Sequence, residues 1–270
     1  MNMKTEIRSR LKQLEQERGI RMLYACESGS RAWGFASPDS DYDVRFIYAH
    51  EPDWYLSIDR RDETIELPLD GELDLAGWDL RKALRLFAKS NGALIEWLHS
   101  PIVYLDAPEI TGVWRSLIPD AVSPKALASH YLGQCRRIWL GLLQSDQIRA
   151  KHYLYALRSL LAARLILRKR TVAPVRFAAL LAASDLPGSI EQAITRLLES
   201  KTVAPESLVL ATDPLLHRFI GFELSKHERV ARELRRAIVD RGLIDAFLRD
   251  AIASPFEREQ ESGLVAAAYQ

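Results

Sequence analysis

The segment from residue 29 to residue 43 constrains this chain more than any other part of its sequence. A Gly29-Ser30 pair stands twelve residues ahead of an Asp41-x-Asp43 pair, which opens a mostly apolar run over 44–48. Because successive side chains of a strand point to opposite faces, Asp41 and Asp43 are predicted to share one face, about 6–7 Å apart. Two neighbouring carboxylates repel each other unless positive charge lies between them. The segment therefore predicts a site for cations.

The Gly-Ser pair indicates the other half of such a site. Glycine has no Cβ, so backbone N–H groups can approach a phosphate closely at Gly29, and the Ser30 hydroxyl adds a donor. Residues 36–40 have turn chemistry, which lets the chain fold back and bring this turn over the carboxylates. Hard oxygen ligands suit Mg²⁺, which completes its shell with water and substrate phosphates. Either pair alone is an ordinary turn or strand edge, but their order favours a nucleotide and metal site.

This arrangement resembles the signature of the DNA polymerase β-like nucleotidyltransferase superfamily, in which Gly-Ser precedes Asp-x-Asp by about this distance. A third carboxylate on a neighbouring strand completes the site of that superfamily. The alternating strand predicted over 71–78, after the Asp70-Gly71 turn pair, offers Asp74 at the expected place. Glu72 lies two residues earlier on the same face and is the alternative if the register differs.

Longer stretches narrow the resemblance. Residues 29–35, 40–48, 73–84 and 96–104 are similar to the bacterial nucleotidyltransferase family that includes YcgL-type and RNA-ligase-associated proteins, and a weaker likeness extends to 151–158. The resemblance implies an enzyme that moves a nucleoside monophosphate from a nucleoside triphosphate to a hydroxyl acceptor and releases pyrophosphate. The acceptor is left open between an RNA end, a protein side chain and a small molecule.

The expected mechanism uses two Mg²⁺ ions, which Mn²⁺ can replace. Asp41 and Asp43 are expected to bridge both ions. Asp74 completes the coordination of the second ion and can accept the proton of the acceptor hydroxyl. The triphosphate is expected over Gly29 and Ser30, where most of the rate enhancement comes from positioning and charge neutralisation.

Further nucleotide contacts are predicted from cations. Arg31, next to the Gly-Ser turn, is the nearest phosphate candidate. At 100° per residue, Lys151, Tyr155 and Arg158 fall within a helical sector about 60° wide, and together they could hold a triphosphate and stack on a base. The alternative is an ordinary boundary stripe, in which the tyrosine packs and the cations extend along the surface.

The pattern of elements changes near residue 120. Before it, a helix over 4–16, the strands above and a helix capped by Asp79 predict an α+β fold with a polymerase β-like mixed sheet. After it, apolar residues recur at helical spacing and predict about five to seven helices, with breaks at Pro174, Pro187, Pro205 and Pro214. We expect a nucleotidyltransferase domain over 1–120 and a helical domain over 121–270 that contacts the nucleotide or the acceptor.

Composition limits the remaining classes of function. The 37 basic and 36 acidic residues are nearly balanced, so no global field favours tight binding of nucleic acid. Cys26 and Cys135 have no metal or redox spacing. No signal core occurs in the first twenty residues, and no apolar run approaches the ~18 residues of a membrane span. We therefore expect a cytoplasmic protein that does not enter membranes.

Two non-catalytic hypotheses remain beside the enzyme. One is a nucleotide-binding regulatory module without turnover. The intact carboxylates argue against it, because an unused acidic cluster costs stability through repulsion. The other is a subunit of a toxin–antitoxin or repair complex, whose helical half chiefly binds a partner.

Overall fold

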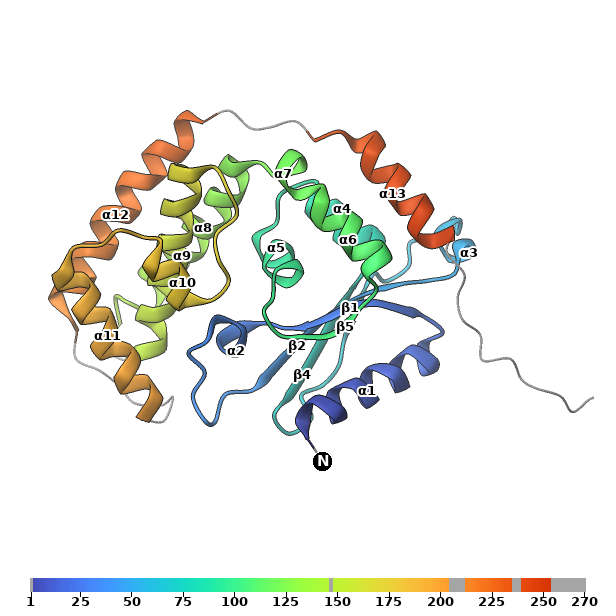
Figure 1. Ribbon diagram of the computed structural model, residues 1–270, viewed down its shortest axis with the longest axis horizontal. Coiled ribbons are helices and arrows are strands. Elements are labelled where there is room, and N and C mark those ends of the chain that lie inside the picture. Colours follow the sequence, from blue (N-terminus) through green and yellow to red (C-terminus); the bar gives the residue numbers. More distant parts are fainter. Residues whose placement is uncertain (1, 146–147, 204–211, 235–238, 254–270) are drawn as a thin grey trace, which may run out of the picture.

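The computed structural model describes residues 2–145, 148–203, 212–234 and 239–253, and places a mixed sheet beside a group of helices (Figure 1). Within these residues the sheet has the strand order β3-β4-β2-β1-β5. Strands β2 and β4 are parallel, and the other neighbouring pairs are antiparallel. The strands are β1 (Arg21–Glu27), β2 (Tyr42–Ala49), β3 (Thr64–Glu66), β4 (Leu73–Asp79) and β5 (Val103–Asp106).

The helices divide into a group that surrounds the sheet and a group that follows it. The first group is α1 (Met3–Arg18), α2 (Gly29–Trp33), α3 (Pro52–Tyr55), α4 (Leu80–Phe87), α5 (Gly92–Leu98), α6 (Pro108–Ser116) and α7 (Ile118–Ala121). The second is α8 (Pro124–Gly141), α9 (Ala150–Lys169), α10 (Phe177–Ala182), α11 (Gly188–Val203), α12 (Pro214–Glu233) and α13 (Arg241–Ala253). The predicted α+β class and the helical second half are confirmed.

The two faces of the sheet pack against different helices. On one face, Val44 and Phe46 of β2 belong to the core that α1 closes with Ile7 and Leu11. On the other face, Ile47 belongs to the larger core that includes α4, α5 and the second group of helices. Because side chains alternate along a strand, odd-numbered residues of β2 face that larger core. The carboxylate of Asp43 is therefore on the side of the sheet where the helical half lies.

Local sequence signals place several elements as predicted. The Asp79 side chain caps α4 by accepting the Arg81 N–H at 2.8 Å. Strand β4 follows the turn in which Asp70 and Leu73 form an isolated bridge. Helix α1 begins and ends within two residues of the expected range 4–16. The predicted order of strand, turn, short helix, loop and acidic strand is confirmed in β1, α2 and β2.

Helix α9 is the central helix of the second half and is buried along most of its length. Helix α13 lies apart from this group and returns to the first half, where it packs beside α4 (Figure 1). There the rings of Phe247 and Trp114 lie 5.6 Å apart. The domain boundary near residue 120 stays a prediction, and Pro205 and residues 254–270 of the expected helical domain lie outside the described residues. Among the helices of the described ranges, none has the length and apolar character that a membrane crossing requires.

Candidate active site

The parallel pairing of β2 and β4 brings two of the predicted carboxylates together. Asp43 is the register partner of Asp74, and both side chains are about one-third exposed, at 32% and 37%. Asp41 is exposed and lies one residue before β2 begins, so it borders the strand instead of lying on it. The register thus places Asp43 and Asp74 on neighbouring strands and leaves Asp41 at the entrance to β2.

The same pairing separates Asp74 from its alternative. Glu72 is exposed in the turn before β4, and its carbonyl accepts the Tyr42 N–H at 2.7 Å. Its backbone therefore fixes the start of the parallel ladder. The register with Asp43 favours Asp74 as the third acidic residue of the site.

Gly29 lies directly against Asp43. Its φ is +58°, a left-handed conformation that side chains with a Cβ rarely adopt. A Cβ added to Gly29 would stand 2.0 Å from Oδ2 of Asp43 and 2.9 Å from its Cγ. The neighbouring Ser28 N–H also donates to the Asp43 carbonyl at 2.8 Å. The glycine is thus required both by the turn and by the close approach of the carboxylate.

We expect Gly29→Ala to displace the Asp43 carboxylate and to lower the free energy of unfolding by about 2–4 kcal/mol. Gly19→Ala is the matched control, because Gly19 has φ +57° and nothing within 4 Å of an added Cβ. It should cost only about 1–2 kcal/mol of backbone strain. Chemical denaturation of both proteins measures the difference. Equal losses would show that the approach to Asp43 is unimportant for stability.

Ser30 and Arg31 are engaged by the fold itself. Ser30 is 5% exposed, and its carbonyl accepts the N–H groups of Gly34 and Phe35. Arg31 donates to the carbonyls of Ser40 and Asp41, and its guanidinium lies 3.7 Å from the centre of the Tyr42 ring. These contacts fix the loop that precedes β2. Phosphate binding by either residue stays a prediction.

Arg45 is the residue that sequence reasoning missed. Its Nη2 donates to Oδ1 of Asp43 at 3.1 Å and to Oδ2 of Asp74 at 2.7 Å. The available signal was its position two residues after Asp43, which places both side chains on one face of β2. The apolar pattern of 44–48 hides the role of Arg45, which supplies the positive charge between the two carboxylates.

Glu27 is a second residue that the motif did not include. It is 1% exposed, accepts the Asp43 N–H at 2.9 Å and accepts a hydrogen bond from the Tyr104 hydroxyl. Burial raises the pKa of Glu27. Its two hydrogen bonds join β1, β2 and β5 behind the acidic pair, so Glu27 supports the backbone on which Asp43 stands.

The charges around Asp43 oppose each other. Burial raises the pKa of Asp43 above its ordinary value, Arg45 and Arg31 lower it, and Asp74 and Asp41 raise it further. Asp43 is therefore exposed both to repulsion from two neighbouring carboxylates and to attraction from two arginines.

The donor chemistry of these residues fits a hard divalent cation. Asp43 and Asp74 offer carboxylate oxygens on neighbouring strands, as Mg²⁺ prefers. Across the described ranges, however, no three histidine, cysteine, aspartate or glutamate side chains converge as ligands of one ion. Arg45 occupies the space between Asp43 and Asp74 instead. The two-ion arrangement with Asp41, Asp43 and Asp74 stays a prediction.

Comparison with known families identifies the chain. A family model described as "RlaP: RNA repair pathway DNA polymerase beta family" matches residues 3–250. The chain belongs to this family. It is also 41% identical over 233 residues to the protein YcgL of Bacillus subtilis (strain 168), a match that covers 86% of this chain and 90% of YcgL.

A solved structure gives a more distant likeness. It is the crystal structure of a nucleotidyltransferase-like protein from Exiguobacterium sibiricum 255-15, with 11% sequence identity and a TM-score of 0.30. The match covers 91% of this chain and 79% of that one. The membership in the RlaP family rests on the sequence match.

In this member of the RlaP family, the predicted stripe on α9 packs against α2. Arg158 is 2% exposed and donates to Oε1 of Glu96 at 2.8 Å, and Glu96 also accepts the indole N–H of Trp33 at 3.0 Å. The guanidinium lies 4.2 Å from the centre of the Trp33 ring. The ring of Tyr155 meets that of Trp33 at 5.2 Å. These contacts favour the packing alternative for Tyr155. Arg158 is buried in an ion pair with Glu96 and does not extend along the surface, as that alternative expects of the cations.

Lys151 is half-buried in the first turn of α9. The contact of Lys151, Tyr155 and Arg158 with a nucleotide stays a prediction. Tyr155 and Arg158 join the helical half to α2, the helix that begins with the Gly-Ser turn, through their contacts with Trp33. The helical half is thus linked mechanically to the site.

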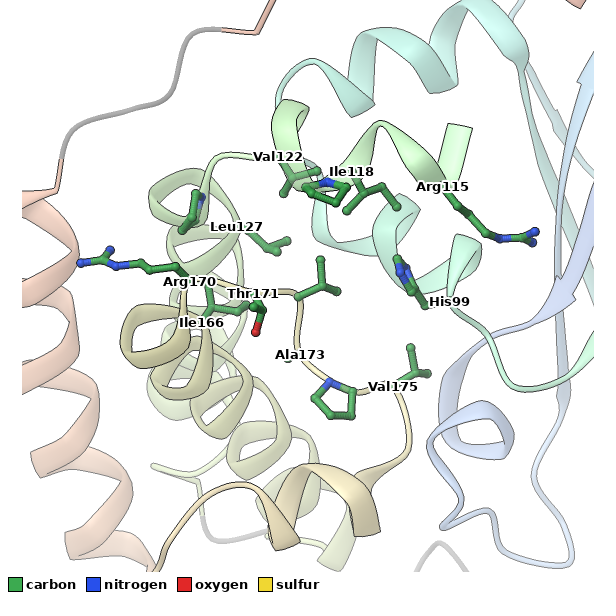
Figure 2. Close-up of a pocket in the computed structure, with 14 residues that line it drawn as sticks. His99, Arg115, Ile118, Val122, Leu127, Ile166, Arg170, Thr171, Ala173 and Val175 are labelled. Carbon is green, nitrogen blue, oxygen red and sulfur yellow. The ribbon is translucent and has the colours of Figure 1, made fainter. Parts of the chain in front are cut away.

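A separate cavity of about 550 Å³ lies between α5–α8 and the segment after α9 (Figure 2). Its walls are mostly apolar, with Ile118, Val122 and Leu127 among them. The guanidinium groups of Arg115 and Arg170 extend away from it in Figure 2. The cavity contains none of the predicted site residues, so it does not mark the acidic site.

Proposed function

We propose that this protein is a metal-dependent nucleotidyltransferase that transfers a nucleoside monophosphate from a nucleoside triphosphate to a hydroxyl group at an RNA end. The observation that carries the proposal is the register of Asp43 and Asp74 on parallel strands, with Gly29 packed against Asp43. Membership in a family described by RNA repair and DNA polymerase β supports both the reaction class and the acceptor.

In this proposal, Asp41, Asp43 and Asp74 would hold two Mg²⁺ ions. The bound ions would neutralise the charge of the triphosphate and lower the pKa of the acceptor hydroxyl. The residues of the chain do the remaining work. The Gly29-Ser30 turn positions the phosphates beside Asp43, and Arg31 stands one residue further along α2. Lys151 is retained as a proposed nucleotide contact from the helical half. A nucleotide contact of Tyr155 or Arg158 would require that side chain to leave its packing against Trp33.

Asp74 is the proposed acceptor of the hydroxyl proton. It lies on the strand next to Asp43, and its side chain is 37% exposed, so an acceptor in solution can approach it. The attacking oxygen then forms its bond to the α-phosphorus while the bond to pyrophosphate breaks. No covalent bond to the enzyme is required, and catalysis comes from positioning and charge.

A nucleotide-binding module without turnover is the second candidate. The repulsion argument against it assumes uncompensated carboxylates, and Arg45 compensates two of them. An acidic pair held by an arginine is stable without a substrate. Turnover therefore has to be measured, because the stability argument alone does not exclude the regulatory module or a partner-binding subunit.

The decisive experiment uses nucleoside triphosphates labelled separately at the α- and γ-phosphates. Each of the four is incubated with the protein, Mg²⁺ or Mn²⁺, and total RNA, protein lysate or metabolite extract. We expect α-label, and no γ-label, in the RNA fraction. Transfer of γ-label would indicate a kinase, and label in protein or metabolites would replace the proposed acceptor.

Asp43→Asn is the control for contaminating enzymes in the same assay. Label that persists with this variant would not come from the proposed site. If no fraction is labelled while calorimetry detects binding of a nucleoside triphosphate, the regulatory module replaces the enzyme.

A further inference from the structure

Arg45 donates hydrogen bonds to four acceptors around the acidic pair of Asp43 and Asp74. Besides the two carboxylates, its Nη1 donates to the carbonyls of Val44 and Asp74 at 3.1 Å each. The side chain is only 19% exposed. A planar guanidinium with several donors suits this position better than an ammonium group does. The arginine is therefore built into the site as its counter-ion.

A divalent ion and Arg45 compete for the same oxygen atoms. Oδ1 of Asp43 and Oδ2 of Asp74 accept hydrogen bonds from one nitrogen, Nη2, which stands between the two strands. An ion that ligates these two oxygen atoms must take the place of that nitrogen. The guanidinium would then lie beside a divalent cation, where like charges repel.

The released guanidinium needs an anionic partner close to the acidic group. The substrate supplies one, because the triphosphate brings several negative charges to the Gly29 turn beside Asp43. Binding of the triphosphate and binding of the metal therefore favour each other, since each provides what displacement of Arg45 requires.

We propose that Arg45 occupies the metal position between Asp43 and Asp74 in the absence of nucleotide and transfers to the triphosphate when metal and nucleotide bind. This inference rests on the proposed function. It predicts that the protein binds divalent ions weakly alone and tightly only with nucleotide. Arg45 is in this view a positioning residue that couples the two binding events.

The test begins with Mn²⁺ alone, followed by the loss of the electron paramagnetic resonance signal of the free ion. We expect Arg45→Met to bind Mn²⁺ about tenfold more tightly than the unmodified protein, a factor worth ~1.4 kcal/mol. Arg81→Met is the matched control, because Arg81 pairs with Glu63 at 2.8 Å away from the acidic pair. It should leave Mn²⁺ binding unchanged.

Two further variants assign the change to this site. Adding Asp43→Asn to Arg45→Met should remove the gained Mn²⁺ affinity. Arg45→Lys keeps the charge with fewer donors and should bind Mn²⁺ with intermediate affinity. Thermal melting checks that each protein is folded. If Arg45→Met does not fold, the comparison is made with Arg45→Lys.

The nucleotide is measured separately, with the α,β-methylene analogues of the four triphosphates at saturating Mn²⁺. Calorimetry should show that Arg45→Met binds the preferred analogue about tenfold more weakly, because one charged contact is lost. A purely structural arginine would weaken both metal and nucleotide. The opposite signs of the two effects distinguish the proposed role.

Equal or weaker Mn²⁺ binding by Arg45→Met, in a protein that does bind Mn²⁺, would overturn the inference and leave the proposed function standing. If neither protein binds Mn²⁺, with or without any of the analogues, the proposed metal-dependent function fails and the inference fails with it.

Discussion

Asp43→Asn is expected to reduce nucleotidyl transfer about a thousandfold or more while the protein stays folded. Asparagine keeps the size of the side chain but removes the negative charge, and loss of one charge-stabilising group of a transition state costs ~4 kcal/mol. The variant also leaves Asp74 as the only carboxylate of the register pair. Initial rates of α-label transfer, with the acceptor fraction identified above, measure the effect.

The stability of Asp43→Asn should be equal to or slightly above that of the unmodified protein at neutral pH. Burial, together with Asp74 and Asp41, raises the pKa of Asp43 from its ordinary 3.8. The folded state therefore keeps this proton to a higher pH than the unfolded state does. As pH rises from about 4 through the raised pKa, ionisation of Asp43 lowers stability, and asparagine removes that loss. Loss of one contact with Arg45 limits the gain.

Asp39→Asn is the matched control for charge. Asp39 is exposed in the loop before β2, and its replacement removes one negative charge from the same region. It should keep both activity and stability. Full activity in folded Asp43→Asn would overturn the assignment of Asp43, and a similar loss in Asp39→Asn would point to the overall charge of the loop instead.

The local parts of the fold follow from short-range signals. Strand alternation, the Asp70-Gly71 turn and the Asp79 cap act within a few residues, so the sequence alone places β2, β4 and the beginning of α4. The positive φ of Gly29 belongs to this class too. The turn chemistry of residues 36–40 also predicts that Gly29 returns to the carboxylates, but not how closely it approaches Asp43.

The missed features are contacts between distant residues. Arg45 reaches Asp74, 29 positions away, only because β2 and β4 are parallel and in register. Glu27 meets Tyr104 across 77 positions. A motif names the residue types at a site, but it does not say which neighbouring cation neutralises them. That choice is made by the strand order, which periodicity does not determine.

The α9 stripe illustrates the same limit. Helical spacing correctly places Tyr155 on one side of α9, and Arg158 lies less than one turn further on. Whether such residues face solvent or another helix depends on packing. Here Glu96 of α5 and Trp33 of α2 meet Arg158, which buries its charge.

Arg158→Ala is expected to lower the free energy of unfolding by about 3–5 kcal/mol, because it leaves the Glu96 carboxylate half-buried without its cation. The Arg158 side chain is 3% exposed and that of Glu96 is 12% exposed, so water compensates little. Loss of packing against Trp33 adds to the effect. Urea denaturation of the full chain measures this loss of stability.

Arg168→Ala is the matched control on the same helix, because Arg168 is 43% exposed and lies 3.7 Å from an exposed Asp185 carboxylate. It should change stability by less than about 1 kcal/mol.

Replacing Glu96 as well separates the contribution of the ion pair to stability from the contribution of packing. Arg158→Ala with Glu96→Gln should recover part of the lost stability, because the unpaired carboxylate is gone, whereas Glu96→Gln alone should be destabilising. Non-additivity of this kind is the signature of a direct pair.

Nucleotide binding decides between the two roles of Arg158. If Arg158→Ala melts like the unmodified protein and weakens nucleotide binding tenfold or more, the residue contacts the triphosphate. If stability falls and the folded protein binds nucleotide unchanged, Arg158 joins α9 to α2 and α5, and the triphosphate contacts must come from other cations.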